Sequence, residues 1–247
     1  MPPKFRLFAG PNGSGKTFLF EHLKRNGTIH TELYINADRV LRDLNKRGNF
    51  NFNAYRIKSS ETEFIMSVAE STLFPRLNDP LLLDKIHVKG GVLRFDIDRE
   101  ELNAYHASFI ATYLAIKLFE TNQSFCFETV MSHTDKLKLF GLAKKHKYKS
   151  YLYFVFTENP ELNIARVKLR AAGGLHDVDP WIVKSRYDRT FALLPEALEL
   201  ADEAYIIDNS DSPTSLIEKH NHNVSLVPGQ TLNKRQAALL KAVITNR

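Results

Sequence analysis

The feature that most constrains this chain is a glycine-rich segment near its beginning, at residues 10–17. It satisfies the pattern G-x-x-x-x-G-K-[ST], the phosphate-binding P-loop. A short, mostly apolar run at residues 5–9 precedes it, which is typical of a buried parallel strand, and apolar residues at helical spacing follow at 18–24. Strand, loop and helix therefore occur in the order that the motif requires.

The composition of this segment suits a nucleoside triphosphate. Glycines let the backbone bend around an anion and turn N–H groups toward it, and the following helix adds the positive end of its dipole. Lys16 is predicted to reach the outer phosphates, and the Thr17 hydroxyl to ligate Mg²⁺. The alternative is a glycine-rich turn that binds nothing. The predicted nucleotide-binding residues are Gly10, Pro11, Asn12, Gly13, Ser14, Gly15, Lys16 and Thr17.

Length and composition limit the remaining possibilities. The chain has 247 residues, 43% of them hydrophobic, and we expect a single domain over 1–247 with an insertion at 45–98 and a lid at 171–186. One cysteine, Cys126, excludes an internal disulfide and favours a cytoplasmic location, as does the lack of a signal peptide before the first strand. No apolar run approaches the length needed to cross a membrane. The net charge of +6 is dispersed, so nucleic acid is not the expected partner.

The pattern along the chain predicts an α/β fold. Strands expected at 5–9, 32–38, 123–129, 151–156 and 205–209, with an edge strand at 224–228, alternate with helices expected from residue 39 and at 61–77, 99–120, 134–146, 160–172 and 233–245. A further helix is expected to bear Lys184, Arg186, Tyr187 and Arg189. This alternation is typical of a doubly wound parallel sheet of about five strands with helices on both faces, the P-loop nucleoside triphosphate hydrolase/kinase fold. Residues 45–98 are irregular apart from a hairpin expected near 81–95.

Two carboxylates lie at the ends of predicted strands. In open parallel sheets, ligands bind at the carboxyl ends of the strands. Asp38 follows the second strand and Glu128 ends the third. A kinase needs a carboxylate that orients or deprotonates a hydroxyl, Mg²⁺, and arginines over the transferring phosphate. A cap for the helix at residue 39 is the equal alternative for Asp38. The strand-ending Asp-Glu of motor ATPases and the Asn-Lys-x-Asp guanine reader are both absent.

Four arginines flank the loop that starts at Gly173-Gly174: Arg166, Arg170, Arg186 and Arg189. Any of them could lie on an ordinary solvated helix face. The alternative is a lid that closes over bound phosphates, supplies positive charge in the transition state and excludes water. The pair Arg170 and Arg186 favours the lid.

Taken in order, these motifs resemble the zeta toxin family of P-loop kinases. The resemblance comprises the P-loop, Ile35-Asn36-Ala37-Asp38, Phe125-Cys126-Phe127-Glu128-Thr129, the helix from Pro160 to Arg170, Gly173-Gly174-Leu175-His176-Asp177-Val178, and Arg186-Tyr187 with Arg189. It runs from about residue 8 to residue 194. The spacing from Asp38 to Glu128 is longer than in compact members, which implies that the acceptor region is rebuilt.

The resemblance implies a kinase that uses ATP or GTP and Mg²⁺ to phosphorylate a hydroxyl of a small molecule, UDP-N-acetylglucosamine in the best-known members. An antitoxin protein is a possible partner. Asp38 would be the catalytic base, assisted by Lys16, Arg170 and Arg186. Asp38, Glu128 and Thr129 would contact the acceptor, and Thr17 and Glu128 the metal. The alternatives are a non-catalytic nucleotide-dependent switch or partner-binding module, and a polynucleotide kinase.

Overall fold

The computed structural model describes residues 1–173 and 178–245. The chain forms two compact units: Met1–Glu32 together with Cys126–Arg247, and Leu33–Phe125. Each unit is described by itself. The irregular segment at 45–98 belongs to the second unit, together with the helices on either side of it. No helix in the described ranges is long and apolar enough to cross a membrane.

The first unit is built on a sheet whose strands follow the order β10-β9-β8-β7-β1-β6. Strand β1 pairs in parallel with β7, and β7 in parallel with β8, whereas β9 and β10 extend the sheet as antiparallel strands. The strands are β1 (Lys4–Ala9), β6 (Phe125–Thr129), β7 (Lys149–Phe156), β8 (Glu203–Asp208), β9 (Thr214–His220) and β10 (Asn223–Leu226). The strand β9 was not predicted, because only Leu216 and Ile217 are apolar in its polar surroundings.

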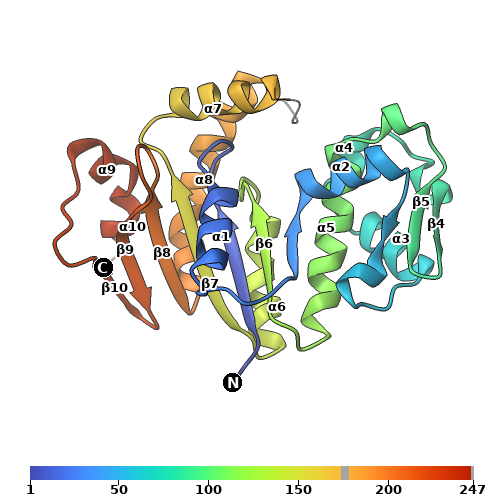
Figure 1. Ribbon diagram of the computed structural model, residues 1–247, viewed down its shortest axis with the longest axis horizontal. Coiled ribbons are helices and arrows are strands. Elements are labelled where there is room, and N and C mark those ends of the chain that lie inside the picture. Colours follow the sequence, from blue (N-terminus) through green and yellow to red (C-terminus); the bar gives the residue numbers. More distant parts are fainter. Residues whose placement is uncertain (174–177, 246–247) are drawn as a thin grey trace. The chain divides into compact units, whose positions relative to one another are not determined.

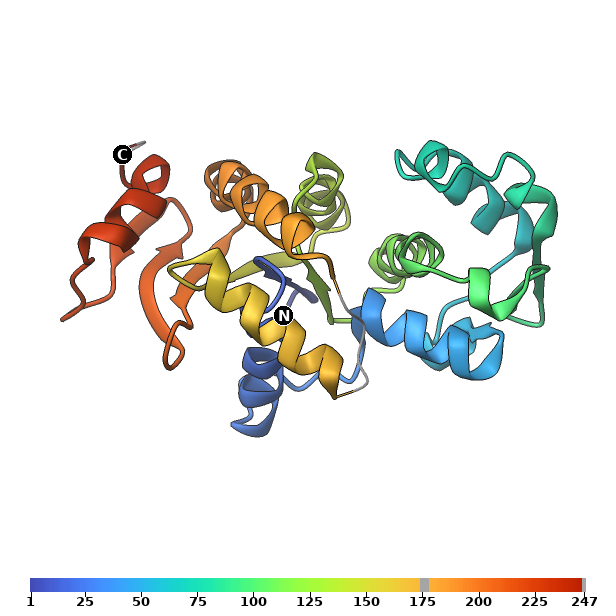
Figure 2. The same ribbon diagram turned by 90° about the horizontal axis from the view of Figure 1, so that it is seen from above.

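Helices cover both faces of this sheet, as expected for the predicted fold class. Helix α1 (Lys16–Arg25) lies on one face, and α6 (Lys138–Lys145) and α8 (Pro180–Leu200) lie on the other (Figures 1 and 2). Helix α7 (Pro160–Ala172) crosses the edge where the parallel strands end, and it packs against α8. The short η4 (Thr134–Lys136), α9 (Lys234–Leu239) and α10 (Lys241–Thr245) complete the unit. The α/β P-loop fold is thereby confirmed.

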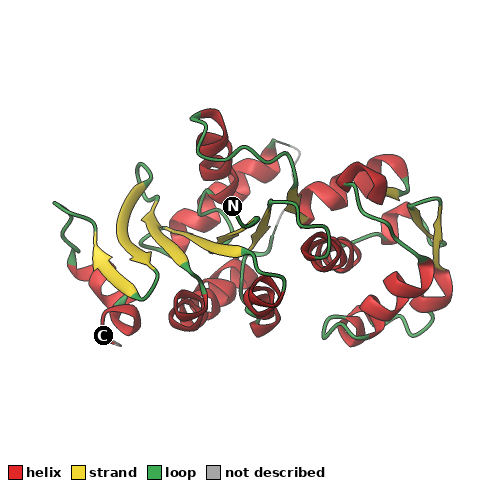
Figure 3. Ribbon diagram, turned by 90° about the horizontal axis from the view of Figure 1, so that it is seen from below, coloured by secondary structure: helices red, strands yellow, loops and turns green. Residues whose placement is uncertain are grey.

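The second unit combines helices with a small antiparallel sheet in the order β3-β5-β4 (Figure 3). Helix α2 packs against α5, and α3 packs against both α5 and β4. In chain order the elements are β2 (Tyr34–Asn36), α2 (Ala37–Arg47), β3 (Phe50–Asn51), η1 (Phe52–Tyr55), α3 (Glu61–Ala69), α4 (Phe74–Leu77), η2 (Leu82–Lys85), β4 (Ile86–Lys89), β5 (Val92–Phe95), η3 (Arg99–Glu101) and α5 (Ala104–Phe119).

An aromatic cluster forms the core of the second unit. The rings of Phe52 and Phe64 each lie 5.2 Å from the ring of Tyr113, and Phe95 packs edge-on against Phe64. All four side chains are buried. Such edge-to-face pairs add to the free energy of apolar burial. The aromatic segment at residues 49–55, which no periodicity explained, therefore supplies core side chains.

Two predicted helices of this unit differ from the observed ones. The helix expected at 61–77 is broken after Ala69, and Pro75 stands in the first turn of the short α4, the position where its missing N–H costs least. The helix expected at 99–120 starts as the 3₁₀ turn η3. Helix α5 begins only after Asn103, which caps it in a reciprocal capping box with His106.

His106 makes the stability of the second unit sensitive to acid. Its Nδ1 accepts a hydrogen bond from the Asn103 backbone N–H at 3.2 Å, while the buried Nε2 has no hydrogen-bond partner in the described residues. Burial lowers the pKa of His106 from 6.5 to about 4, against an opposing effect of Asp79. Below pH 6.5 the unfolded chain therefore binds more protons than the folded protein does. The free energy of unfolding is for this reason greatest above pH 6.5 and decreases as the pH falls toward 4.

We expect the parent protein to lose about 2 kcal/mol of unfolding free energy between pH 7 and pH 5, as this pKa difference implies. Glutamine at position 106 keeps the capping box but does not titrate. The loss should therefore shrink in His106→Gln and persist in the control His30→Gln, which changes an exposed side chain. Urea denaturation, followed by circular dichroism at pH 7 and at pH 5, measures this loss of unfolding free energy in the parent and in both variants. An unchanged loss in His106→Gln would contradict the assignment.

Candidate nucleotide-binding site

The P-loop connects β1 to α1 and is shaped by glycines in left-handed conformations. Gly10, Gly13 and Gly15 have φ values of 141°, 73° and 95°. At Gly10 a β-carbon would lie 1.9 Å from the carbonyl oxygen of Val155, on the neighbouring strand β7. The loop thus runs against the sheet at a distance that only glycine permits.

Replacing Gly10 by alanine is expected to cost about 2–4 kcal/mol of unfolding free energy, because strained backbone and a clash with main-chain atoms that cannot move aside add together. Gly229 provides a matched control. It also has a positive φ, 81°, but a β-carbon there would meet nothing within 4 Å. Gly229→Ala should therefore cost only about 1 kcal/mol. Thermal and urea unfolding of both variants would measure the difference, and equal losses would contradict it.

Lys16 is a further residue that defines the site. It is almost completely buried, with 6% of its surface exposed. Its Nζ donates hydrogen bonds to the carbonyl oxygens of Gly10 and Pro11, at 3.0 and 2.8 Å. The ammonium group is therefore folded back over the loop that starts at Gly10. A cation held there is positioned for an anion bound inside the loop.

Thr17 and Glu128 meet although 111 residues separate them. The Thr17 hydroxyl donates to the Glu128 carboxylate, with Oγ1 2.8 Å from Oε2 and 3.1 Å from Oε1. Glu128 lies near the end of β6, and both side chains are half-buried. A hydroxyl beside a carboxylate is an oxygen donor pair of the kind that Mg²⁺ prefers, so these residues fit the predicted metal. In the described ranges, no group of three or more His, Cys, Asp or Glu side chains is arranged so that it could hold a metal ion.

Two asparagines from distant segments support the P-loop. Asn163 of α7 donates its Nδ2 to the carbonyl oxygen of Asn12 at 2.6 Å, and its Oδ1 accepts a hydrogen bond from Thr157. Asn209, which follows β8, donates its Nδ2 to the carbonyl oxygen of Ser14 at 2.8 Å. Both asparagines are buried. The carbonyl groups of Asn12 and Ser14 are therefore fixed by side chains from two different segments of the chain.

The predicted arginines play different structural roles. Arg166 donates one guanidinium nitrogen to the Asn209 carbonyl and another to the Ser210 carbonyl, both at 2.8 Å, and so fixes the segment that carries Asn209. Asn163, Arg166 and Arg170 stand at i, i+3 and i+7 of α7 and share one face of that helix. Arg170 and Arg186 are half-buried, whereas Arg189 is exposed.

Four residues of the predicted lid lie outside the part of the chain that the structure describes. These are Gly174, Leu175, His176 and Asp177, and α7 and α8 flank this segment. Tyr187 of α8 is buried and donates its hydroxyl to the Thr157 carbonyl at 2.6 Å, and burial raises the pKa of this phenol. One end of the predicted lid is therefore anchored to the end of β7. Closure of the lid stays a prediction.

Asp38 lies in the second unit, in the first turn of α2, so the strand expected at 32–38 is shorter than predicted. Asn36, not Asp38, caps this helix, because its side-chain oxygen accepts the backbone N–H of Arg39 at 3.1 Å. The capping alternative for Asp38 is thus wrong. Its role as catalytic base stays a prediction. The Thr129 hydroxyl accepts a hydrogen bond from the Met131 N–H and so stabilises the turn after β6.

Asn163 and Asn209 are the residues of this site that the sequence did not reveal. Neither asparagine belongs to a recognisable pattern, although Asn209 follows a predicted strand, at the end where binding residues of such sheets usually lie.

Comparison with known proteins supports the fold. No family model and no curated protein sequence matches the chain. The solved complex AvrRxo1-ORF1:AvrRxo1-ORF2 with ATP is similar in structure, with a TM-score of 0.57 and 13% identity over 94% of this chain. This chain spans 66% of that one, and 62% in the complex with sulphate ions. The PezAT toxin-antitoxin system of Streptococcus pneumoniae is also similar, with a TM-score of 0.50 and 14% identity over 99% of this chain and 85% of that one.

At these identities the likeness establishes the fold alone. The protein shares the α/β fold of these two solved complexes. This likeness in fold agrees with the resemblance to zeta toxins, which rests on the motifs.

Proposed function

We propose that the protein is a kinase of zeta-toxin type that transfers the γ-phosphoryl group of ATP or GTP to a hydroxyl group of a small molecule. The observation that carries the proposal is the contact between Thr17 and Glu128 beside a braced P-loop. A loop that only formed a turn would need neither Lys16 folded over it nor a carboxylate at its helix. The similar fold of a complex solved with ATP supports the same nucleotide.

In this mechanism the P-loop holds the triphosphate before reaction. The loop N–H groups and the N-terminus of α1 surround the phosphates, and Lys16 exchanges the carbonyl groups of Gly10 and Pro11 for phosphate oxygens. Because Asn163 and Asn209 already fix the loop, little reorganisation accompanies binding. Preorganised donors of this kind are the largest contribution to most enzymatic rate enhancements.

Thr17 and Glu128 would hold Mg²⁺, which neutralises charge on the phosphates when bound. Glu128 keeps the Thr17 hydroxyl directed toward the carboxyl end of β6. Arg170 and Arg186 would add positive charge to the transferring group as the lid closes. Asp38 would orient or deprotonate the acceptor hydroxyl, which attacks the γ-phosphorus in line with the departing ADP oxygen.

Incubation of the protein with γ-labelled ATP and a small-molecule extract tests this function. The kinase predicts a labelled metabolite, identified by mass spectrometry, with UDP-N-acetylglucosamine as the first candidate. A nucleotide-dependent switch predicts no labelled product, and a polynucleotide kinase predicts labelled 5′ ends when oligonucleotides are supplied. Either of those results would overturn the proposal.

A further inference from the structure

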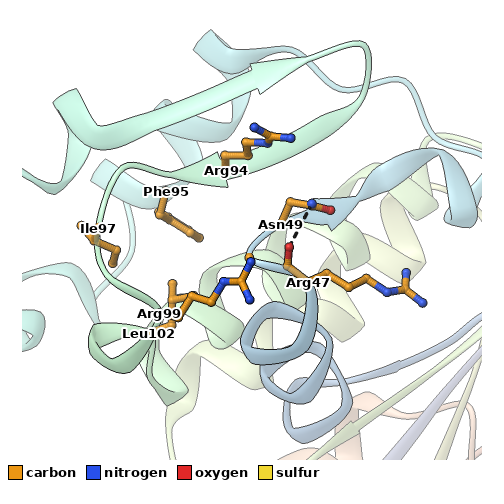
Figure 4. Close-up of a pocket in the computed structure, with 8 residues that line it drawn as sticks. Arg47, Asn49, Arg94, Phe95, Ile97, Arg99 and Leu102 are labelled. Atoms are coloured by element: carbon orange, nitrogen blue, oxygen red, sulfur yellow. Dashed lines mark hydrogen bonds between the residues drawn. The ribbon is translucent and has the colours of Figure 1, made fainter.

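The second unit contains a cavity of about 230 Å³. None of the residues discussed above for nucleotide binding lines this cavity. It lies between the end of α2, strand β5 and the turn η3 (Figure 4). Three of its lining residues are arginines and the others include one amide and apolar side chains: Arg47, Arg94, Arg99, Asn49, Phe95 and Leu102. No lining residue is acidic.

The positive charges of this cavity are not neutralised within the protein. In the part of the chain that the structure describes, the guanidinium groups of Arg47, Arg94 and Arg99 form no hydrogen bond or ion pair. This holds although Asp98 and Glu100 flank Arg99 in the sequence. Arg94 and Arg99 are both exposed and carry like charges at one concavity, and an anion between them would offset their repulsion.

The Arg99 side chain passes close to the backbone at Gly48. Gly48 ends α2 with a φ of 69°, and a β-carbon there would lie 2.9 Å from Nε and 3.1 Å from Nη2 of Arg99. The guanidinium plane therefore occupies space that a side chain at position 48 would fill. Figure 4 shows Arg99 directed toward the end of α2 and Arg94 on the strand beside it, whereas Arg47 at the rim points away from both.

The walls of the cavity are suited to a phosphate group. Phe95 and Leu102 are each 8% exposed and form an apolar wall, which lowers the local dielectric constant and strengthens nearby charge interactions. A guanidinium group presents two parallel N–H donors that match phosphate oxygens, and unlike an ammonium group it is weakly hydrated.

We propose that this cavity binds a small phosphate-bearing molecule, at a site separate from the P-loop. A small ligand is favoured over nucleic acid for two reasons. The cavity is a single concave spot of about 230 Å³, whereas nucleic acids contact extended basic surfaces. Four exposed acidic residues, Asp96, Asp98, Glu100 and Glu101, alternate in the sequence with the lining residues Phe95, Ile97, Arg99 and Leu102 and would repel a long polyanion.

Protection from chemical modification tests the site in the intact protein. The P-loop is first saturated with a non-hydrolysable ATP analogue, pyrophosphate is added as the probe, and arginines are modified with phenylglyoxal and mapped by peptide mass spectrometry. Pyrophosphate should slow modification of Arg94 and Arg99 by at least about fivefold. Arg42, an exposed arginine of α2 outside the cavity, is the internal control. The proposal would be overturned if pyrophosphate slowed the modification of Arg42, Arg94 and Arg99 equally, or if it slowed the modification of none of them.

Calorimetric titration of the same nucleotide-saturated protein gives the second measurement. The double variant Arg94→Gln and Arg99→Gln should weaken pyrophosphate binding by at least tenfold, whereas Arg42→Gln should leave it within twofold, in line with the strength of charge-assisted hydrogen bonds. Thermal unfolding of both variants verifies that they fold. Unchanged affinity in the double variant, or an oligonucleotide that protects these arginines at lower concentration than pyrophosphate, would overturn the assignment.

Discussion

Replacing Lys16 by alanine is expected to reduce phosphotransfer by about a thousandfold or more, the loss seen when a preorganised donor is removed from a transition-state site. Lys16 is buried and its Nζ is already positioned by two carbonyl oxygens of the P-loop. Removing it takes away the positive charge that faces the transferring group. It also leaves those carbonyls without their donor, so nucleotide affinity should fall as well.

Steady-state turnover and nucleotide binding by calorimetry measure these two effects separately. Lys16→Met, which keeps the aliphatic stem but not the charge, shows whether the loss is electrostatic. Lys168→Ala is the matched control, because Lys168 is an exposed lysine of α7. Turnover within tenfold of the parent in Lys16→Met would mean that the P-loop does not serve phosphotransfer.

Replacing Asp38 by asparagine is expected to lower the transfer rate by about 10²–10⁴-fold, the usual contribution of a positioned general base. Nucleotide affinity should change by less than about twofold, because Asp38 belongs to the acceptor side of the proposed mechanism. The variant should fold normally. Asn36 caps α2, so the helix keeps its cap, and the lost interaction of the carboxylate with the helix dipole costs about 0.3–1 kcal/mol.

Single-turnover measurements with preloaded nucleotide separate the chemical step from binding. Asp43→Asn, on the same helix, is the control and should retain parental rates. If transfer by Asp38→Asn stayed within about tenfold of the parent, a difference of roughly 1.4 kcal/mol, the base would have to be another group.

The P-loop and the parallel core could be predicted because their signals are local. Strand, loop and helix at residues 4–25 follow from one motif, and β7 and α7 follow from an aromatic run and from Asn159-Pro160. Asn159 indeed caps α7, with Pro160 in the first turn. Each of these signals lies within about ten residues, where periodicity and capping preferences are strongest.

The rest depends on contacts between distant residues, which one sequence does not record. Nothing near Asn163 or Asn209 indicates that each will bond to the P-loop. Similarly, Thr17 was predicted for metal binding, but its contact with Glu128 depends on the neighbouring positions of β1 and β6. The second unit was least predictable, since its aromatic residues pack across η1, α3 and α5 without a simple period.

The bracing of the P-loop also fixes when the site can form during synthesis. Residues 10–17 leave the ribosome early, but their supports at positions 163 and 209 emerge roughly 150 and 195 residues later. At common elongation rates of about 5–20 residues per second, the growing chain passes many seconds with an unsupported loop. Nucleotide binding of full strength should therefore begin only after residue 209 has been translated and has left the ribosome.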